Sequence, residues 1–325
     1  MSRMVDGQTA QTDCRLLCAD ECAYGIGPGP VLNRQEPYFT HAGFLQPPTV
    51  IDAGMDGIDA ALVGVCDSAI VVAFRGTLPP DDCSLPVVLD WLQSFHFEPV
   101  TSPLFAGTVH SGFLDAFTRL WPQVKAAIDA LRTSHPGLDV HVTGHSKGGA
   151  VATLVAWKFC ALGLKPARVT TFASPRPGDA AFAQAYTALG LTHTRYENEL
   201  DAVPFYPPDF DALVALHALH DKPLTDEGPM KWDYAPVGEL RFIRADGSVV
   251  GDAPGLAASR SHEIVKALIE GHASRVAAAH SLVPTTSPTN PATAGQSTYA
   301  RGVCPDLSDL SITSRQSIGL NDSVT

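Results

Sequence analysis

The sequence has no long hydrophobic run and few basic residues, and each shortage excludes a class of protein. No window of about twenty uncharged apolar residues occurs in the 325 residues, so no membrane-spanning helix is expected. Lysine and arginine number 22 against 34 acidic residues, which gives a formal net charge of -12. Because a phosphate backbone is bound by clustered basic side chains, this balance argues against a nucleic-acid partner. An anionic lipid surface would also repel the chain.

The start of the sequence lacks a second feature, a secretory signal. Its first thirty residues contain no apolar run of about seven or more, so a cytoplasmic protein is expected, or a secreted one if the natural chain begins earlier. Without a signal, the seven cysteines are expected to be mostly reduced thiols. Cys14, Cys18 and Cys22 recur at four-residue steps and would share one face of a helix, which most simply packs on a core. A metal site on that face is the weaker alternative, because no second Cys or His cluster lies nearby.

What the chain does contain is enough apolar side chain, 45% of its residues, to bury a large core. Hydrophobic periodicity predicts helices over 10–24, 113–131, 150–162, 179–189 and 261–271, the last of them closing the fold. Apolar β-type runs predict strands over 60–66, 69–76, 138–143, 167–173 and 191–197, and a hairpin over 239–250. Alternation of strands and helices predicts an α/β fold, a mostly parallel central sheet with helices on both faces. Residues 284–325, rich in Pro, Ser and Thr, are expected to be a largely disordered tail behind a domain at 1–283.

One serine lies in a pattern typical of a nucleophile. Residues 144–148, GHSKG, match G-x-S-x-G between a predicted strand and a predicted helix, which is the context that a nucleophile elbow requires. The free N–H groups at the start of that helix favour the negative charge of a tetrahedral intermediate. Ser146 is therefore the candidate nucleophile, and a turn without catalytic role is the alternative. A serine hydroxyl needs a base, so an acid and a histidine are expected downstream.

Several ordered segments give the chain a specific resemblance. They are AFRGT (73–77), DWL (90–92), VHSGF (109–113), VTGHSKGG (142–149), TFASPRPGD (171–179) and YENELDAVPFYPP (196–208). With these the chain resembles the class 3 lipases, an α/β-hydrolase family that includes secreted fungal triacylglycerol lipases. The resemblance implies an α/β-hydrolase fold and a Ser-Asp-His triad that needs no metal and no cofactor.

The resemblance also implies roles for individual residues. The family's acid lies in a D-x-V-P context, which here is Asp201, with Glu197 and Glu199 as alternatives. Its histidine falls after the last hairpin at the start of the final helix, which here is His262. Four other histidines also follow the acid, namely His217, His220, His272 and His280. Two histidines, His110 and His145, precede the acid and would serve as structural support.

The oxyanion hole and a lid are implied in the same way. Thr77, at the end of the FRGT segment, would donate its backbone N–H and hydroxyl to the oxyanion, although it could instead be an ordinary turn residue. Lys147 would donate its backbone N–H, while its side chain points to solvent or to a nearby carboxylate. Residues 78–100 occupy the position of a mobile lid, and a fixed wall of the acyl pocket fits them equally well.

The function implied is hydrolysis of carboxylic esters of lipids through an acyl-enzyme. The partner would be an acylglycerol or another lipid ester, met at a lipid–water interface that carries no strong negative charge. Two alternatives stay open at this point. A lipid-binding or interaction protein could retain the scaffold without turnover, and an acyltransferase or thioesterase could use the same triad.

Overall fold

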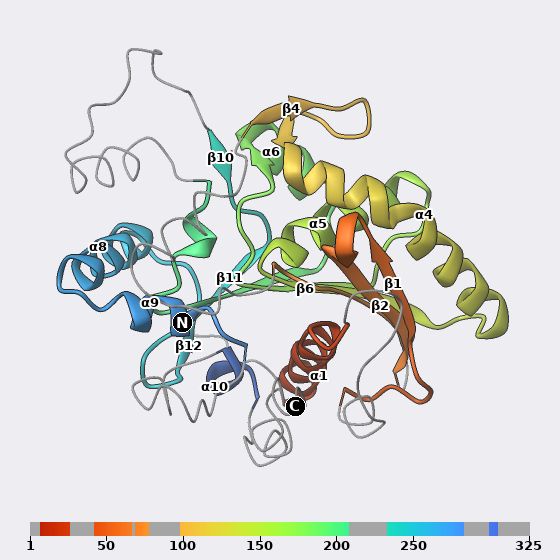
Figure 1. Ribbon diagram of the computed structural model, residues 1–325, viewed down its shortest axis with the longest axis horizontal. Coiled ribbons are helices and arrows are strands. Elements are labelled where there is room, and N and C mark those ends of the chain that lie inside the picture. The colour runs from red at the N-terminus through yellow and green to blue at the C-terminus, as the bar shows by residue number, and fades with distance from the viewer. Residues whose placement is uncertain are drawn as a thin grey trace, which may run out of the picture.

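Figure 1 shows the computed structural model of the protein, which describes residues 7–26, 42–66, 69–77, 98–207, 233–282 and 299–304. Its centre is an eight-stranded sheet in the order β1-β2-β3-β6-β7-β9-β11-β12. These strands are β1 (Thr49–Ala53), β2 (Asp59–Cys66), β3 (Ala69–Phe74), β6 (Asp139–His145), β7 (Arg168–Phe172), β9 (His193–Asn198), β11 (Glu239–Ile243) and β12 (Val249–Val250). From β3 to β11 the neighbours pair in parallel, whereas the pairs at both ends of the sheet are antiparallel. The predicted mostly parallel sheet is therefore confirmed.

Helices cover both faces of this sheet (Figure 1). On one face lie α4 (Ser111–Ser134), α5 (Lys147–Ala161) and α6 (Ala180–Ala188), and on the other lie α1 (Gly7–Ala23) and α10 (Tyr299–Val303). Helices α8 (Leu256–Ile269) and α9 (Ala273–Ala279) pack with the chain that follows β9. Two short 3-10 turns, η1 (Met55–Gly57) and η2 (Val203–Phe205), complete the helical elements of the described residues. A small second sheet pairs β10 (Tyr234–Ala235), β8 (Gly178–Asp179), β5 (Thr108–His110) and β4 (Pro99–Thr101).

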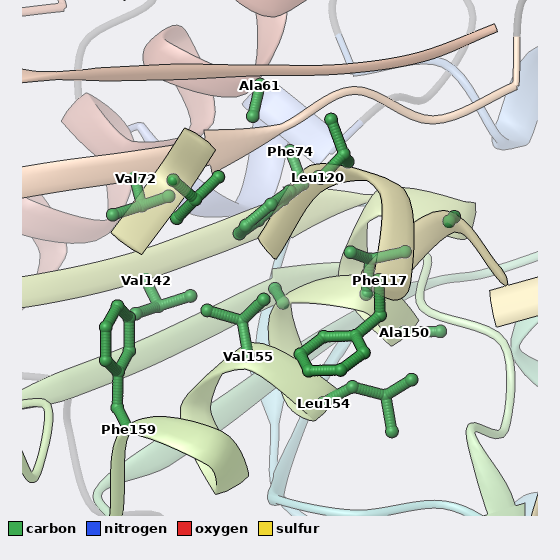
Figure 2. Close-up of a cluster of buried hydrophobic side chains, with 14 of the residues drawn as sticks. Ala61, Val72, Phe74, Phe117, Leu120, Val142, Ala150, Leu154, Val155 and Phe159 are labelled. Carbon is green, nitrogen blue, oxygen red and sulfur yellow. The ribbon is translucent and has the colours of Figure 1, made fainter. Parts of the chain in front are cut away.

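The sequence of each element explains its place in these layers. Strand β3 (AIVVAF) is buried along its whole length, as expected for a strand with helices on both sides. Helix α4 buries a stripe at three- and four-residue steps, comprising Phe113, Ala116, Phe117, Leu120, Val124 and Ile128. Helix α5 is mostly small residues and buries nearly all of them, so it can lie close to the sheet. Figure 2 shows the resulting interdigitation of α4 and α5 side chains with those of β2, β3 and β6.

Each helix and strand that the sequence predicts up to the late hairpin is present, although β1, β4, β5, β8 and β10 were not predicted, and the prediction is wrong about the C-terminal part of the chain. The expected last helix, 261–271, is α8, and in the part of the chain that the structure describes two further helices, α9 and α10, come after it. The second of these, α10, lies inside the segment that was expected to be a disordered tail. Its Tyr299 and Ala300 are completely buried against the sheet. Residues 299–304 are therefore part of the folded domain, which does not end at residue 283.

A disulfide joins the two ends of the described chain. Cys14 of α1 is bonded to Cys304, 290 residues later, directly after α10. The cysteines were expected to be mostly reduced, and Cys18, Cys22, Cys66 and Cys160 are free thiols, but the Cys14–Cys304 pairing was not predicted. Helix α1 does carry Cys14, Cys18 and Cys22 toward the core, as the four-residue spacing predicts. The bridge fastens α1 and α10 together on the same face of the sheet.

Helix α1 also carries two acidic side chains into that interface. The Asp13 carboxylate accepts hydrogen bonds from Arg168, Thr170 and Tyr196. Asp20 is fully buried and accepts one hydrogen bond, from the Thr143 hydroxyl at 2.8 Å. Burial raises the pKa of the Asp20 carboxyl well above its usual value, because there is little to stabilise its charge. In the folded protein this group therefore holds its proton to a higher pH than in the unfolded chain.

Asp20→Asn is expected to make stability less sensitive to pH. An unfolded aspartate ionises near pH 3.9, so the parent loses stability relative to the amide as pH rises above that value, by about 1.4 kcal/mol per pH unit until the folded carboxyl also ionises. The free energy of unfolding in urea, measured for both proteins at pH 5, 6, 7 and 8, tests this difference. Asp115→Asn on the exposed face of α4 is the matched control and should run parallel to the parent. A parallel Asp20→Asn curve would show that the buried group is already ionised.

Candidate active site

The candidate nucleophile lies at the junction of β6 and α5 in an uncommon backbone conformation. Ser146 has φ 56° and ψ -133°, one of two positive φ values among the described non-glycine residues. The turn is fixed by two backbone hydrogen bonds, Ser146 N–H to Phe172 C=O at 2.9 Å and Gly149 N–H to Ser146 C=O at 2.8 Å. A strained conformation that its surroundings enforce is typical of functional positions. The serine Oγ is buried and has no hydrogen-bond partner among the residues that the structure describes.

The glycines on both sides of Ser146 are required by close backbone approach. A Cβ on Gly144 would lie 2.2 Å from the Gly148 oxygen, and a Cβ on Gly148 would lie 2.1 Å from the Phe74 oxygen. The first contact lets helix α5 start directly above β6. The second brings the end of β3 against the start of α5. The G-x-S-x-G pattern is thus explained locally by the strand-turn-helix geometry that it predicts.

Asp201, the candidate acid, is completely buried after β9 and accepts hydrogen bonds from three directions. Its Oδ1 accepts from the Val203 backbone N–H at 3.0 Å, and its Oδ2 accepts from the Tyr299 hydroxyl at 2.5 Å. Both oxygens lie 3.0 Å from Nδ1 of His280. Since a carboxylate only accepts, the Nδ1 of His280 carries a proton. This leaves Nε2 as the atom of the neutral ring that can take a proton.

The histidine paired with Asp201 is therefore His280 and not His262. His262 is exposed on α8, and no contact between it and Asp201 is recorded. His280 directly follows α9, and the centroid of its imidazole is 4.6 Å from that of His145, the residue before Ser146. His272 begins α9 and is beside Glu270 instead. His217 and His220 lie outside the described residues.

The alternative acids have other partners. Glu197 is ion-paired with Arg195 and Arg260 on the buried side of β9. Glu199 is half-buried, and burial raises its pKa. Neither is recorded in contact with His280, so the structure favours Asp201 among the three carboxylates.

Tyr299 is a site residue that the sequence analysis missed. It is fully buried on α10, donates to Asp201 and accepts a hydrogen bond from the Asn198 backbone N–H at 3.1 Å. Burial, followed by the neighbouring Asp201, raises the pKa of the Tyr299 hydroxyl well above its usual value, so it remains a donor. The sequence does place Tyr299 five residues before Cys304, but this position would have indicated a place in the core only if the Cys14–Cys304 pairing had been known.

The two candidate oxyanion donors lie on elements that meet at the serine. Thr77 follows Gly76 at the end of the β3 segment, and a Cβ placed on Gly76 would be 2.7 Å from the Ser146 Cβ. Lys147 is the first residue of α5, where backbone N–H groups are free of helical partners by geometry. Its ammonium turns away from the reaction centre and pairs with Asp59 at 2.8 Å, which confirms the predicted contact with a carboxylate.

Asp59 is the buried centre of an ion cluster beside the elbow. This carboxylate is 2% exposed and also pairs with Arg119 of α4 at 2.8 Å. The Lys147 ammonium donates a further bond to the Ile58 carbonyl at 3.3 Å. Burial lowers the pKa of Lys147, and Asp59 counteracts that effect. The cluster therefore joins β2, α4 and the residue after the nucleophile.

Asp59→Ala is expected to destabilise the fold by about 3 to 5 kcal/mol, because it leaves a buried ammonium without its counter-ion. Lys147→Met should cost less, since Asp59 keeps Arg119 and the stem of Met fills the same space. Urea unfolding of the two variants beside the parent measures the difference. The opposite order of stability would show that the ammonium is not paired in solution.

The predicted lid, 78–100, lies outside the described residues except for 98–100, of which Pro99 and Val100 belong to β4. Cys83 is outside them as well. Among the described residues, no group of three or more His, Cys, Asp or Glu side chains is arranged to hold a metal ion. None of the described helices is both long and apolar enough to cross a membrane.

Comparison of the chain with known proteins finds a match to one family. Residues 71–210 match the model of the family Lipase (class 3). Over this segment the chain resembles the class 3 lipases. The match includes the elbow and the acid, but the histidine at 280 lies beyond it.

Individual relatives agree with this resemblance. A secreted mono- and diacylglycerol lipase 1 of Fusarium solani is 35% identical over 56% of this chain and 53% of its own. A lipase of Rhizomucor miehei is 34% identical over 51% of this chain and 44% of its own, and a rice phospholipase A1-II 4 is 31% identical over 46% and 43%. The chain thus spans about half the length of the curated relatives it matches. The solved triacylglyceride lipase of Rhizomucor miehei superimposes with a TM-score of 0.56 at 23% identity, covering 75% of this chain and 82% of that one, which confirms the α/β-hydrolase type of fold.

Proposed function

We propose that this protein hydrolyses carboxylic esters of lipids through an acyl-enzyme, with Ser146, His280 and Asp201 as its triad. The observation that carries the proposal is the His280–Asp201 pair beside a strained serine at a strand-to-helix turn. A solved triacylglycerol lipase of similar fold is described as having a serine protease triad as its catalytic centre. A role in binding alone would need neither the strained serine nor the buried pair.

In the proposed reaction, Oγ of Ser146 attacks the ester carbonyl carbon while Nε2 of His280 takes its proton. Asp201 holds the ring through Nδ1–H and stabilises the imidazolium that forms. Backbone N–H groups of Thr77 and Lys147 would stabilise the oxyanion, each donor contributing about 3 kcal/mol of barrier. His280 then gives the proton to the leaving alcohol, and a water molecule releases the acyl group by the same steps.

We propose a neutral acylglycerol, met at a lipid–water interface, as the preferred substrate class. Relatives of this chain are named mono- and diacylglycerol lipases and phospholipases A1, so the sequence family includes both head-group classes. The formal net charge of -12 disfavours an anionic phospholipid surface, whereas contact with neutral lipid does not depend on charge sign.

The Cys14–Cys304 disulfide and the relatives named as secreted support an oxidising compartment in place of the cytoplasmic location expected from the sequence. Mass spectrometry of peptides from the native host, alkylated before reduction, tests this location. The peptides holding Cys14 and Cys304 should be recovered as a linked pair. Recovery of both as alkylated thiols would contradict secretion.

The function itself is tested with p-nitrophenyl esters from acetate to palmitate, using the parent and Ser146→Ala at matched folding. Turnover in the parent that is lost in the variant supports the proposal, and the chain-length optimum separates a lipase from an esterase. Equal turnover in both, or none in either, contradicts it. Emulsified diacylglycerol and anionic phospholipid vesicles compared at equal surface area test the substrate class, and added alcohol or thioester reveals an acyltransferase or thioesterase.

A further inference from the structure

A chain of hydrogen bonds connects helix α1 to the backbone of His280. The Tyr24 hydroxyl, one residue past α1, is 2.6 Å from Nδ1 of His145. On the opposite side of that ring, Nε2 of His145 is 2.8 Å from the carbonyl oxygen of His280. The Gly76 backbone N–H donates to the Tyr24 oxygen. The chain thus connects the residue before Thr77, the residue before Ser146 and the histidine that contacts Asp201.

The direction of every bond in this chain can be deduced. A carbonyl oxygen only accepts, so His145 carries a proton on Nε2 and donates it to His280. His145 is 4% exposed, and burial lowers its pKa well below the usual value, so the ring is neutral. A neutral ring with its proton on Nε2 has an accepting Nδ1. Tyr24 must therefore donate to Nδ1, and burial keeps its hydroxyl protonated by raising its pKa.

We propose that His145 and Tyr24 are positioning residues for catalysis, with His145 holding the backbone of His280 so that the imidazole stays between Asp201 and Ser146. The proposal rests on the proposed function, because it concerns the base of that reaction. His280 needs such support, since it follows α9, a helix of only seven residues. Its imidazole is fixed on one side by Asp201, and its main chain by His145.

The geometry assigns different weights to the two residues. His145 adjoins Ser146 in sequence and touches His280 in space, so its position relates nucleophile and base directly. Tyr24 acts one step further away, by fixing which nitrogen of His145 is protonated. Loss of the Tyr24 hydroxyl would remove the donor to Nδ1, and wherever the ring then moved its proton to Nδ1 the bond to the His280 carbonyl would be lost.

A matched pair of substitutions separates positioning from general packing. In His145→Gln the side-chain amide reaches the position of Nε2 and can still donate to the His280 carbonyl. In His145→Asn the shorter amide reaches only the position of Nδ1, toward Tyr24. On a soluble p-nitrophenyl ester, His145→Asn should lose kcat roughly 10- to 100-fold with KM nearly unchanged, because the base is displaced. His145→Gln should recover most of the loss, and Tyr24→Phe should lose about three- to tenfold, the equivalent of one ordinary hydrogen bond.

Equal losses in the Gln and Asn variants, or a loss expressed in KM alone, would overturn the proposal. Nitrogen-15 NMR of the histidine rings gives a readout that does not depend on turnover or on any variant folding. The parent should show His145 as the neutral Nε2–H tautomer, and a protonated Nδ1 would overturn the assignment. If no protein turned over ester while this tautomer was observed, the proposed function would fail and the hydrogen-bond chain would stand.

Discussion

His280→Ala is expected to lower kcat for ester hydrolysis by about 10⁴- to 10⁶-fold, whereas His262→Ala should leave it close to that of the parent. The reason is geometric, since among the histidines that the structure describes only His280 has its Nδ1 against the Asp201 carboxylate. Without that imidazole nothing accepts the proton of Ser146, and the residual rate comes from substrate binding and oxyanion stabilisation.

The measurement is kcat on one soluble ester at several pH values, with thermal unfolding as the check on folding. His262 is exposed on α8, so its replacement is the matched control for changing a histidine in this part of the chain. A large loss in His262→Ala together with activity in His280→Ala would reverse the assignment and restore the expectation drawn from sequence.

Asp201→Asn is the second large effect, with an expected loss of about 10⁴-fold in kcat. The carboxylate accepts from His280, Val203 and Tyr299, and an amide cannot accept from all three. If its NH2 group faces His280, it donates to Nδ1 and moves the ring proton to Nε2, where the ring can no longer act as base. If it faces Tyr299 instead, that hydroxyl must stop donating.

Tyr299→Phe distinguishes these routes, because it removes the competing donor and keeps the ring that packs on Phe172. Tyr299→Phe alone should lower kcat far less than Asp201→Asn does. Combined with Asp201→Asn, it gives the amide a way to present its oxygen to His280, so the double variant should be more active than Asp201→Asn. An additive double variant would show that Tyr299 does not influence the carboxylate.

Local sequence was enough to predict the strand-turn-helix geometry around Ser146 but not the histidine that pairs with Asp201. The elbow is defined by five consecutive residues whose glycines permit a strand-turn-helix contact, so no distant information is needed. His280 was missed because the family's histidine was sought at the start of the final helix, and α8 was taken for that helix. Helix α9, ASRVAAA, has too few residues to display a hydrophobic period.

The distant partners could not be predicted for a related reason. Lys147 and Asp59 are 88 residues apart, and Tyr299 and Asp201 are 98 residues apart. The order of strands in the sheet decides which of these distant side chains come into contact, and no local pattern of residues determines that order. Tyr299 was hidden further by its Pro-, Ser- and Thr-rich surroundings, whose composition is typical of disorder.

The late position of His280 and Tyr299 also determines when the site can first exist during synthesis. The acid precedes Tyr299 by 98 residues, which a ribosome takes roughly 5 to 20 s to add. During that interval the emerging polypeptide already contains its serine and its carboxylate, yet the base and the buried phenol have not been made. In the hydrolase proposed here, a nascent polypeptide that has not yet reached residue 280 lacks the proposed base and is expected to be inert toward lipid esters.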